Sequence, residues 1–119
     1  GLFQAIQYAG ITALYECADE VERIKGVFQK RRDIVVDGLN SMGWNIQKPK
    51  GTFYIWAPAP GGMSGAEFAA RVIEESHVVL TPGQSFGDTE EAKSYFRISF
   101  TLNDDRLREA LDRMGKLKF

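Results

Sequence analysis

Arg97 has the most clearly defined surroundings of the side chains that could do chemistry. It lies within residues 94–101, where apolar and polar residues alternate, so Tyr95 and Ser99 share its face of an expected strand. A guanidinium matches a carboxylate with two parallel hydrogen bonds, and a strand would fix its direction. The pattern therefore allows two interpretations: a cation on a solvated sheet surface, or one aimed at an anionic ligand.

Other catalytic arrangements lack the residues to build them. The sequence has one histidine, His77, and one cysteine, Cys17, so we expect no Cys/His metal cluster and no Ser-His-Asp or Cys-His arrangement. His77 falls at an expected helix-to-strand junction, where a local hydrogen bond would explain it. Glu90 and Glu91 are adjacent acids in a polar stretch and are expected to be solvated. No catalytic residue is predicted in this chain.

Length and composition favour one ordinary globular domain over residues 1–119, with 44% hydrophobic residues. Fifteen basic and sixteen acidic residues are interspersed and give a net charge of -1, which argues against a nucleic-acid or membrane-surface partner. No apolar run reaches the roughly 18 residues of a membrane span. A single cysteine favours a reducing, cytoplasmic setting. The chain starts at Gly1 without methionine, so we expect a fragment.

Two helices must come first, because residues 4–39 contain no proline and repeat apolar residues at helical spacing. We predict them at roughly 3–15 and 20–41, with a break near Ala18, where Asp19 and Glu22 form a capping-box pattern. Gly43 is expected to end the second helix. The expected apolar stripe consists of Leu14, Ala18, Val21, Phe28, Val35 and Leu39.

Strand patterns follow from Trp44 onward. We predict strands at 44–47, 52–57, 78–81 and 94–101, with Phe96, Ile98 and Phe100 facing the core and a polar loop over 83–92. Trp44 and Trp56 are expected to pack in the core or on a sheet face. One helix spans 65–76 behind a Ser64 cap paired with Glu67, and another starts after Asn103 or Asp104 and ends at Gly115. The fold class is a two-layer α/β (α+β) domain with a mostly antiparallel or mixed sheet of three to four strands. Its helices pack on one side, and long N-terminal helices precede it.

Three motifs together carry a family resemblance: KGTFYIW at 50–56, VLTPGQSFG at 79–87 and YFRISF at 95–100. In this order and at these intervals they resemble the C-terminal small domain of class I/II pyridoxal-phosphate-dependent aminotransferases, which have fold type I. The similarity covers nearly the whole chain. Within the family it is greatest to the aspartate aminotransferase-like or LL-diaminopimelate aminotransferase-like branch.

The resemblance implies a role for individual residues. Arg97 would bind the α-carboxylate of an amino-acid or 2-oxo-acid substrate, and Phe53 and Tyr54 would form pocket walls. For the aromatic pair, plain sheet packing is the competing interpretation. Gly83, in the Pro82-Gly83 pair, would provide backbone angles denied to other residues at the domain junction.

The resemblance also implies partners. The lysine that holds pyridoxal phosphate would belong to a large cofactor domain of the same parent chain, because no lysine here lies in the family's Ser-Lys motif. This chain alone would then bind no cofactor and be inactive, and the intact enzyme would be a homodimer that moves amino groups from amino acids to 2-oxo acids. Two alternatives remain: a free-standing α/β interaction module with Arg97 as a rim charge, or the small domain of a related pyridoxal-phosphate lyase.

Overall fold

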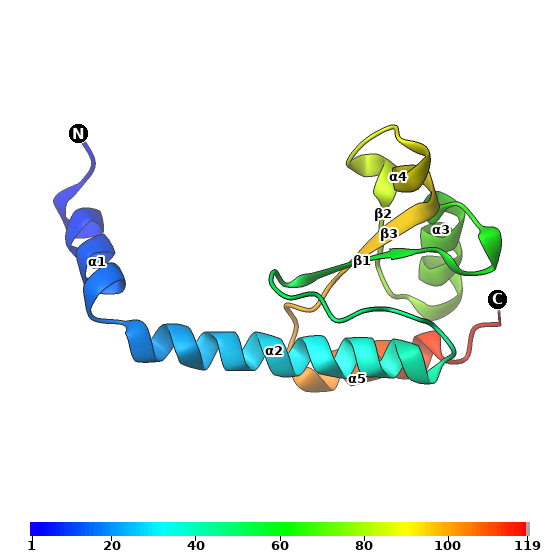
Figure 1. The fold of residues 1–119 in the computed structure, drawn as a ribbon, viewed down its shortest axis with the longest axis horizontal. Helices are drawn as coiled ribbons and strands as arrows, with labels where there is room; N and C mark the ends of the chain where they lie inside the picture. Colours follow the sequence, from blue (N-terminus) through cyan, green and yellow to red (C-terminus); the bar gives the residue numbers. More distant parts are fainter. Residues whose placement is uncertain (119) are drawn as a thin grey trace.

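A computed structural model describes residues 1–118 and contains a small antiparallel sheet with helices against one of its faces (Figure 1). The predicted two-layer α/β fold is confirmed. The elements in chain order are α1 (Gln4–Tyr15), α2 (Ala18–Ser41), β1 (Tyr54–Pro58), η1 (Pro60–Gly62), α3 (Gly65–Ser76), β2 (Thr81–Pro82), η2 (Gly83–Ser85), α4 (Glu90–Ser94), β3 (Tyr95–Ser99) and α5 (Asp104–Met114).

Strand β3 is the centre of the sheet, because the strand order is β1-β3-β2 and both pairings are antiparallel. The predicted alternation along β3 is confirmed. Phe96, Ile98 and Phe100 are buried, whereas Tyr95 and Arg97 are half-buried on the opposite side. Strand β3 therefore separates a core face from an accessible face with a period of two residues.

The predicted strand at 44–47 is wrong, and the segment is irregular. The side chain of Asn40 replaces a strand partner there: its Oδ1 accepts a hydrogen bond from the Ile46 N–H at 2.8 Å, and its Nδ2 donates to the Ile46 carbonyl at 2.9 Å. The sheet therefore has three strands among the described residues. The strand expected at 78–81 is also largely wrong, because residues 78–80 are irregular and only Thr81 belongs to β2.

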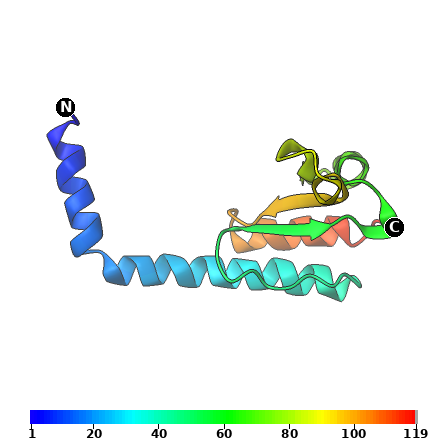
Figure 2. The same cartoon turned by 45° about the horizontal axis from the view of Figure 1, so that its top comes forward.

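Helices α2, α3 and α5 cover the inner face of the sheet and form one core with it. In Figure 2, β1 and β3 lie side by side above α2 and α5. Apolar side chains at helical spacing supply the contacts, and burial of each such side chain contributes roughly 1.5–3 kcal/mol. The largest fully buried side chains are Val35, Val36 and Leu39 of α2, Ile55 of β1, Phe68 and Val72 of α3, Phe96 and Phe100 from the β3 segment, and Met114 of α5.

Helix ends follow local sequence signals with one exception. Gly43 ends α2 as predicted: it has a φ of 94°, and the N–H groups of Gly43 and Trp44 bond to the carbonyls of Asn40 and Leu39, which is the Schellman pattern. The Ser64 cap of α3 is also confirmed, because Ser64 Oγ accepts from the Glu67 N–H and the Glu67 carboxylate accepts from the Ser64 N–H.

The capping box expected at Asp19 and Glu22 is wrong, although the break between the first two helices is confirmed. Helix α2 begins at Ala18 behind Cys17, which makes no side-chain capping bond, so Asp19 already lies inside the first turn. The Glu22 carboxylate pairs instead with Lys25 at 2.7 Å. The acidic residues of the first turn still stabilise the start of α2, since their negative charges lie near the positive end of the helix dipole.

Residues 1–26, which we call the N-terminal arm, extend away from the sheet (Figure 1). Cys17 is the one partly buried residue in this arm. The radius of gyration is 17.5 Å, against about 13.5 Å for a compact chain of this length. Half of the predicted apolar stripe therefore fails: Val35 and Leu39 are buried, but Leu14 is 82% exposed and Val21 48%.

Within residues 1–118, no helix combines the length and apolar character needed to cross a membrane.

Candidate functional site

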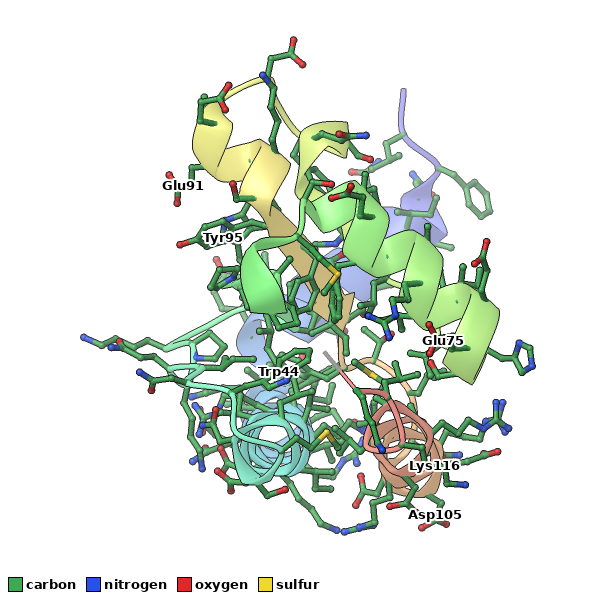
Figure 3. The ribbon with its side chains drawn as sticks, turned by 90° about the vertical axis from the view of Figure 1, so that its right-hand side faces the viewer. Trp44, Glu75, Glu91, Tyr95, Asp105 and Lys116 are labelled. Atoms are coloured by element: carbon green, nitrogen blue, oxygen red, sulfur yellow. The ribbon has the colours of Figure 1, made fainter. Side chains whose placement is uncertain are left out.

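The accessible side of the sheet, which we call the open face, carries the candidate site. It consists of Tyr54 and Trp56 from β1 and Tyr95, Arg97 and Ser99 from β3. Figure 3 shows Tyr95 pointing to the side away from α3, whereas Trp44 lies between α2 and the sheet region. The helices thus leave this face uncovered, and its polar and aromatic side chains can reach a ligand.

Arg97 lies at the middle of the open face because β3 is the central strand. Its cross-strand partners are Trp56 on one side and Thr81 on the other. The guanidinium carbon is 4.2 Å from the centroid of the Tyr54 ring and 4.8 Å from that of Phe86. Both contacts are within the range of cation–π attraction. A rigid strand and two rings therefore fix where this cation points.

The charge of Arg97 has no carboxylate partner among residues 1–118. Its one hydrogen bond there is long, with Nη2 3.5 Å from Thr81 Oγ1, and its Nε is buried without a hydrogen-bond partner. The other arginines all have a carboxylate oxygen within 4.0 Å. They are Arg23, Arg31, Arg32, Arg71, Arg106, Arg108 and Arg113.

An unpaired guanidinium held in a partly dry site is ready to bind an anion. Hydrogen bonds from a guanidinium to a carboxylate are among the stronger ones, so the N–H donors of Arg97 that no internal carboxylate occupies could hold a bound carboxylate. A groove of about 450 Å³ lies directly beside it, within the size range of small-molecule sites. The groove is lined by Gln47, Pro49, Thr52, Tyr54, Ile55, Trp56 and Arg97.

The structure brings Tyr54 and Arg97 together but places Phe53 in a neighbouring groove of about 320 Å³. That second groove lies between α2 and residues 49–53, where the Phe53 ring is 5.8 Å from the ring of Phe28. Phe53 still touches the site indirectly, because its ring centroid is 4.6 Å from that of Tyr54. Within the predicted trio, Tyr54 therefore contacts both Arg97 and Phe53.

Two residues of the site were not singled out in the sequence analysis. Phe86 and Thr81 both contact Arg97, and both lie in the segment that follows α3. The VLTPGQSFG motif contained them, but their distance from Arg97 along the chain gave no sign of contact. Trp56 was expected to pack on a sheet face, which is confirmed by its stacking on Tyr95 at 5.7 Å. Trp44 packs against the core, 5.7 Å from Phe96.

Gly83 has a different role from the one predicted. Its φ is not positive, so special backbone angles are not the reason for a glycine there. The reason is close packing: a Cβ at this position would lie 2.3 Å from the Ala92 carbonyl oxygen and 2.7 Å from that of Tyr95. Gly83 lets the segment after β2 pass directly over the start of β3, which brings Phe86 near Arg97.

The remaining candidates behave as local structural residues. His77 is an exposed left-handed cap at the end of α3, with its N–H bonded to the Ile73 carbonyl at 3.1 Å, so the junction interpretation is confirmed. The expected loop at 83–92 is partly wrong, since Glu90 and Glu91 begin α4. Lys93 bonds to Glu90 and lowers the pKa of that carboxyl. In the described part of the chain, no group of three His, Cys, Asp or Glu residues could hold a metal.

Fold and site together define a two-layer α/β unit that presents an unpaired arginine and aromatic rings on the open face of its sheet. The model of the family "Aminotransferase class I and II" matches residues 2–114. The chain belongs to this family.

Similar proteins support the same assignment. The chain is 46% identical to LL-diaminopimelate aminotransferase of Moorella thermoacetica, over 100% of this chain and 31% of the relative. An aminotransferase structure from Staphylococcus aureus has a TM-score of 0.87 at 34% identity, covering 98% of this chain and 30% of that one. An aromatic aminotransferase from Pyrococcus horikoshii has a TM-score of 0.84 at 34% identity, over 93% and 30%. The chain thus spans about 30% of the length of these relatives.

Proposed function

We propose that this chain is the C-terminal small domain of an aminotransferase and that Arg97 binds the α-carboxylate of the amino-acid or 2-oxo-acid substrate. One observation carries the proposal: Arg97 is the arginine without a carboxylate neighbour in residues 1–118, and it lies at the centre of the open face. A guanidinium that must accept a substrate carboxylate has to be free of internal carboxylates, because these would compete for the same donors.

Tyr54 and Phe53 are proposed as walls of the substrate pocket, at different depths. Tyr54 lines the groove of Arg97 directly, so it is the nearer wall. Phe53 lines the adjacent groove and supports the Tyr54 ring. Aromatic walls exclude water from a bound carboxylate, and the lower local dielectric strengthens its attraction to the guanidinium.

Intact enzymes of this family use pyridoxal phosphate, and the residues of this chain do not fit the group. A cofactor lysine has to reach the reacting centre, but no lysine among residues 1–118 belongs to the open face. Lys25, Lys30, Lys48 and Lys93 are each paired with carboxylates on helix or turn surfaces. We therefore place the cofactor in a large domain of the same parent chain and assign this domain no catalytic residue.

In this scheme the small domain acts by binding and closing. When it moves toward the cofactor domain, Arg97 would bring the carboxylate end of the substrate to a fixed position, and the transfer of the amino group would take place on the other domain. We further propose that residues 1–119 act as one domain and that the intact enzyme is a cytoplasmic homodimer. The apolar N-terminal arm, with its uncovered side chains, is compatible with burial in such an assembly.

The proposal is tested by replacing Arg97 in the full-length protein loaded with pyridoxal phosphate. Arg97→Ala should lower kcat/KM by about 2–5 kcal/mol in transition-state terms, the range expected when one partner of a buried charge pair is removed. Arg97→Lys should also lower it, since an ammonium cannot form the paired bonds of a guanidinium. Steady-state kinetics with amino-acid donors and 2-oxo-acid acceptors measure both effects.

Arg106→Ala is the matched control, because Arg106 lies on the exposed surface of α5 and pairs with Glu109 at 2.6 Å. It removes the same charge from a side chain that lines neither the groove of Arg97 nor that of Phe53, and it should leave kcat/KM unchanged. Near-normal kinetics of both Arg97 variants would contradict the proposal, as would a parent reading frame without a cofactor domain.

A further inference from the structure

We propose that Tyr54 and Phe86 are positioning residues that hold the Arg97 guanidinium in place for the substrate carboxylate while leaving its N–H donors free. The inference rests on the proposed function and extends it to two aromatic side chains. Neither ring is assigned to bind the carboxylate. Their role is to restrict the orientation of the cation that does.

The sheet topology brings the two rings to Arg97 from opposite neighbours of its strand. Tyr54 belongs to β1, which pairs with one edge of β3. Phe86 follows β2 and η2, and β2 pairs with the other edge of β3. The guanidinium carbon lies 4.2 Å from the Tyr54 centroid and 4.8 Å from the Phe86 centroid, so the cation is contacted by aromatic groups from both flanking segments.

Aromatic contacts can hold a guanidinium in place while its N–H groups remain free to bind a carboxylate. A carboxylate that oriented Arg97 would occupy the in-plane N–H donors, as carboxylates do for Arg32, Arg71 and Arg113. An aromatic ring attracts the cation through its π-system and accepts no strong hydrogen bond, so the donors stay available. The long 3.5 Å contact to Thr81 Oγ1 cannot by itself fix the guanidinium.

Each ring is in turn held by other aromatic residues. The Phe86 ring is 5.8 Å from Trp56 in an edge-on arrangement, and Trp56 stacks on Tyr95 at 5.7 Å. On the other side the Tyr54 ring is 4.6 Å from Phe53. These contacts account for large apolar side chains that stay accessible on the open face, where Phe86 is 53% exposed and Trp56 41%. The aromatic cluster orients one cation.

Phe86→Leu and Tyr54→Leu in the full-length, cofactor-loaded protein test the inference. Each variant keeps an apolar side chain but loses the ring. We expect KM for the amino-acid donor to rise between about 2-fold and 30-fold, the equivalent of one cation–π contact, with kcat changed much less. Tyr54→Phe and Phe86→Tyr keep an aromatic ring beside Arg97, so KM should rise less in each of them than in the matching leucine variant. Loss of kcat with unchanged KM would contradict a positioning role.

A second measurement separates positioning from general damage to the fold. The amine that corresponds to the donor amino acid lacks the α-carboxylate, so its slow reaction does not depend on Arg97. In Phe86→Leu and Tyr54→Leu, kcat/KM should fall much further for the amino acid than for the amine. Variants that merely disturb the domain would lose activity toward both to the same extent, and this result would overturn the inference.

The same assay keeps the inference distinct from the proposed function. If Arg97→Ala leaves selectivity for the carboxylate intact, the proposed function fails and the positioning role fails with it. If Arg97→Ala abolishes this selectivity but both leucine variants keep it, the positioning role alone is wrong. Selectivity reduced in all three, most strongly in Arg97→Ala, is the expected result.

Discussion

The two faces of the sheet use aromatic side chains for different purposes. On the inner face, Phe96 is fully buried and packs against Phe68 of α3 with a centroid distance of 4.9 Å. On the open face, Trp56 and Tyr95 stack beside Arg97 and stay accessible. Rings on the inner face fill the core, whereas those on the open face surround a cation.

This difference shows that residues that stabilise the core and residues that bind a ligand can be neighbours along one strand. Phe96 and Arg97 are adjacent in the sequence, and the period of two residues sends them to opposite faces. The core can keep β3 rigid without contributing polar groups to the site. The site can keep an unpaired cation without placing that cation in the core. Single substitutions should therefore affect one property and leave the other intact.

Phe96→Ala should give the largest effect on the inner face. Removal of a fully buried phenylalanine leaves a cavity, so the free energy of unfolding should fall by about 3–5 kcal/mol. Arg97→Ala should lower it by less, about 1–2 kcal/mol, since the side chain loses two cation–π contacts but no ion pair within residues 1–118. Urea denaturation of the two variants measures both values. Equal destabilisation by the two variants would contradict the proposed division of roles between the two faces of the sheet.

The sequence predicted the elements that rest on short-range rules. Alternation along 94–101 identified both faces of β3, and the Ser64 and Gly43 signals located helix ends. Residues 44–47 were predicted incorrectly because Asn40 satisfies the backbone there, and a side-chain bond of this kind leaves no periodic pattern. Gly83 was assigned a wrong reason, because close packing against β3 depends on the fold as a whole.

The candidate site was predictable only in part, because only some of its residues follow short-range rules. Strand periodicity placed Arg97 on the polar face, and the family resemblance added Tyr54 and Phe53. Phe86 was missed because it approaches Arg97 through the pairing of β2 with β3, which joins segments about ten residues apart through an intervening helix. The exposed arm was also missed, since helical spacing shows an apolar stripe but not what covers it.

Gly83→Ala tests a point where the two faces are coupled. An added Cβ would lie 2.3 Å from the Ala92 carbonyl oxygen and 2.8 Å from Trp56 Cη2, so backbone and open face must both shift. We expect a loss of about 1–3 kcal/mol in stability from overpacking. In the full-length protein, KM for the amino-acid donor should rise as well, because Phe86 follows this residue. Thermal unfolding and steady-state kinetics measure the two effects.

Gly51→Ala is the control for Gly83, since a Cβ at Gly51 meets no atom within 4 Å. A stability loss in Gly83→Ala with an unchanged KM would show that the open face adjusts independently of the chain beneath it.

The smallest expected effect concerns the cap of α3, a helix whose buried side chains pack into the core. The Ser64 N–H and hydroxyl donate to the Glu67 carboxylate and lower its pKa below the ordinary value of 4.5. A carboxyl whose pKa is lower in the folded state stabilises the fold above the unfolded-state pKa, and this contribution is lost as the pH falls through the folded value. The stability advantage of wild type over Glu67→Gln should therefore be constant above about pH 4.5 and shrink below it.

Glu74→Gln, which removes an exposed carboxylate from the same helix outside the cap, controls for the loss of charge. Because α3 contacts the inner face, KM for the donor should be unchanged in both variants, and a raised KM in Glu67→Gln would mean that helix α3 also influences the open face.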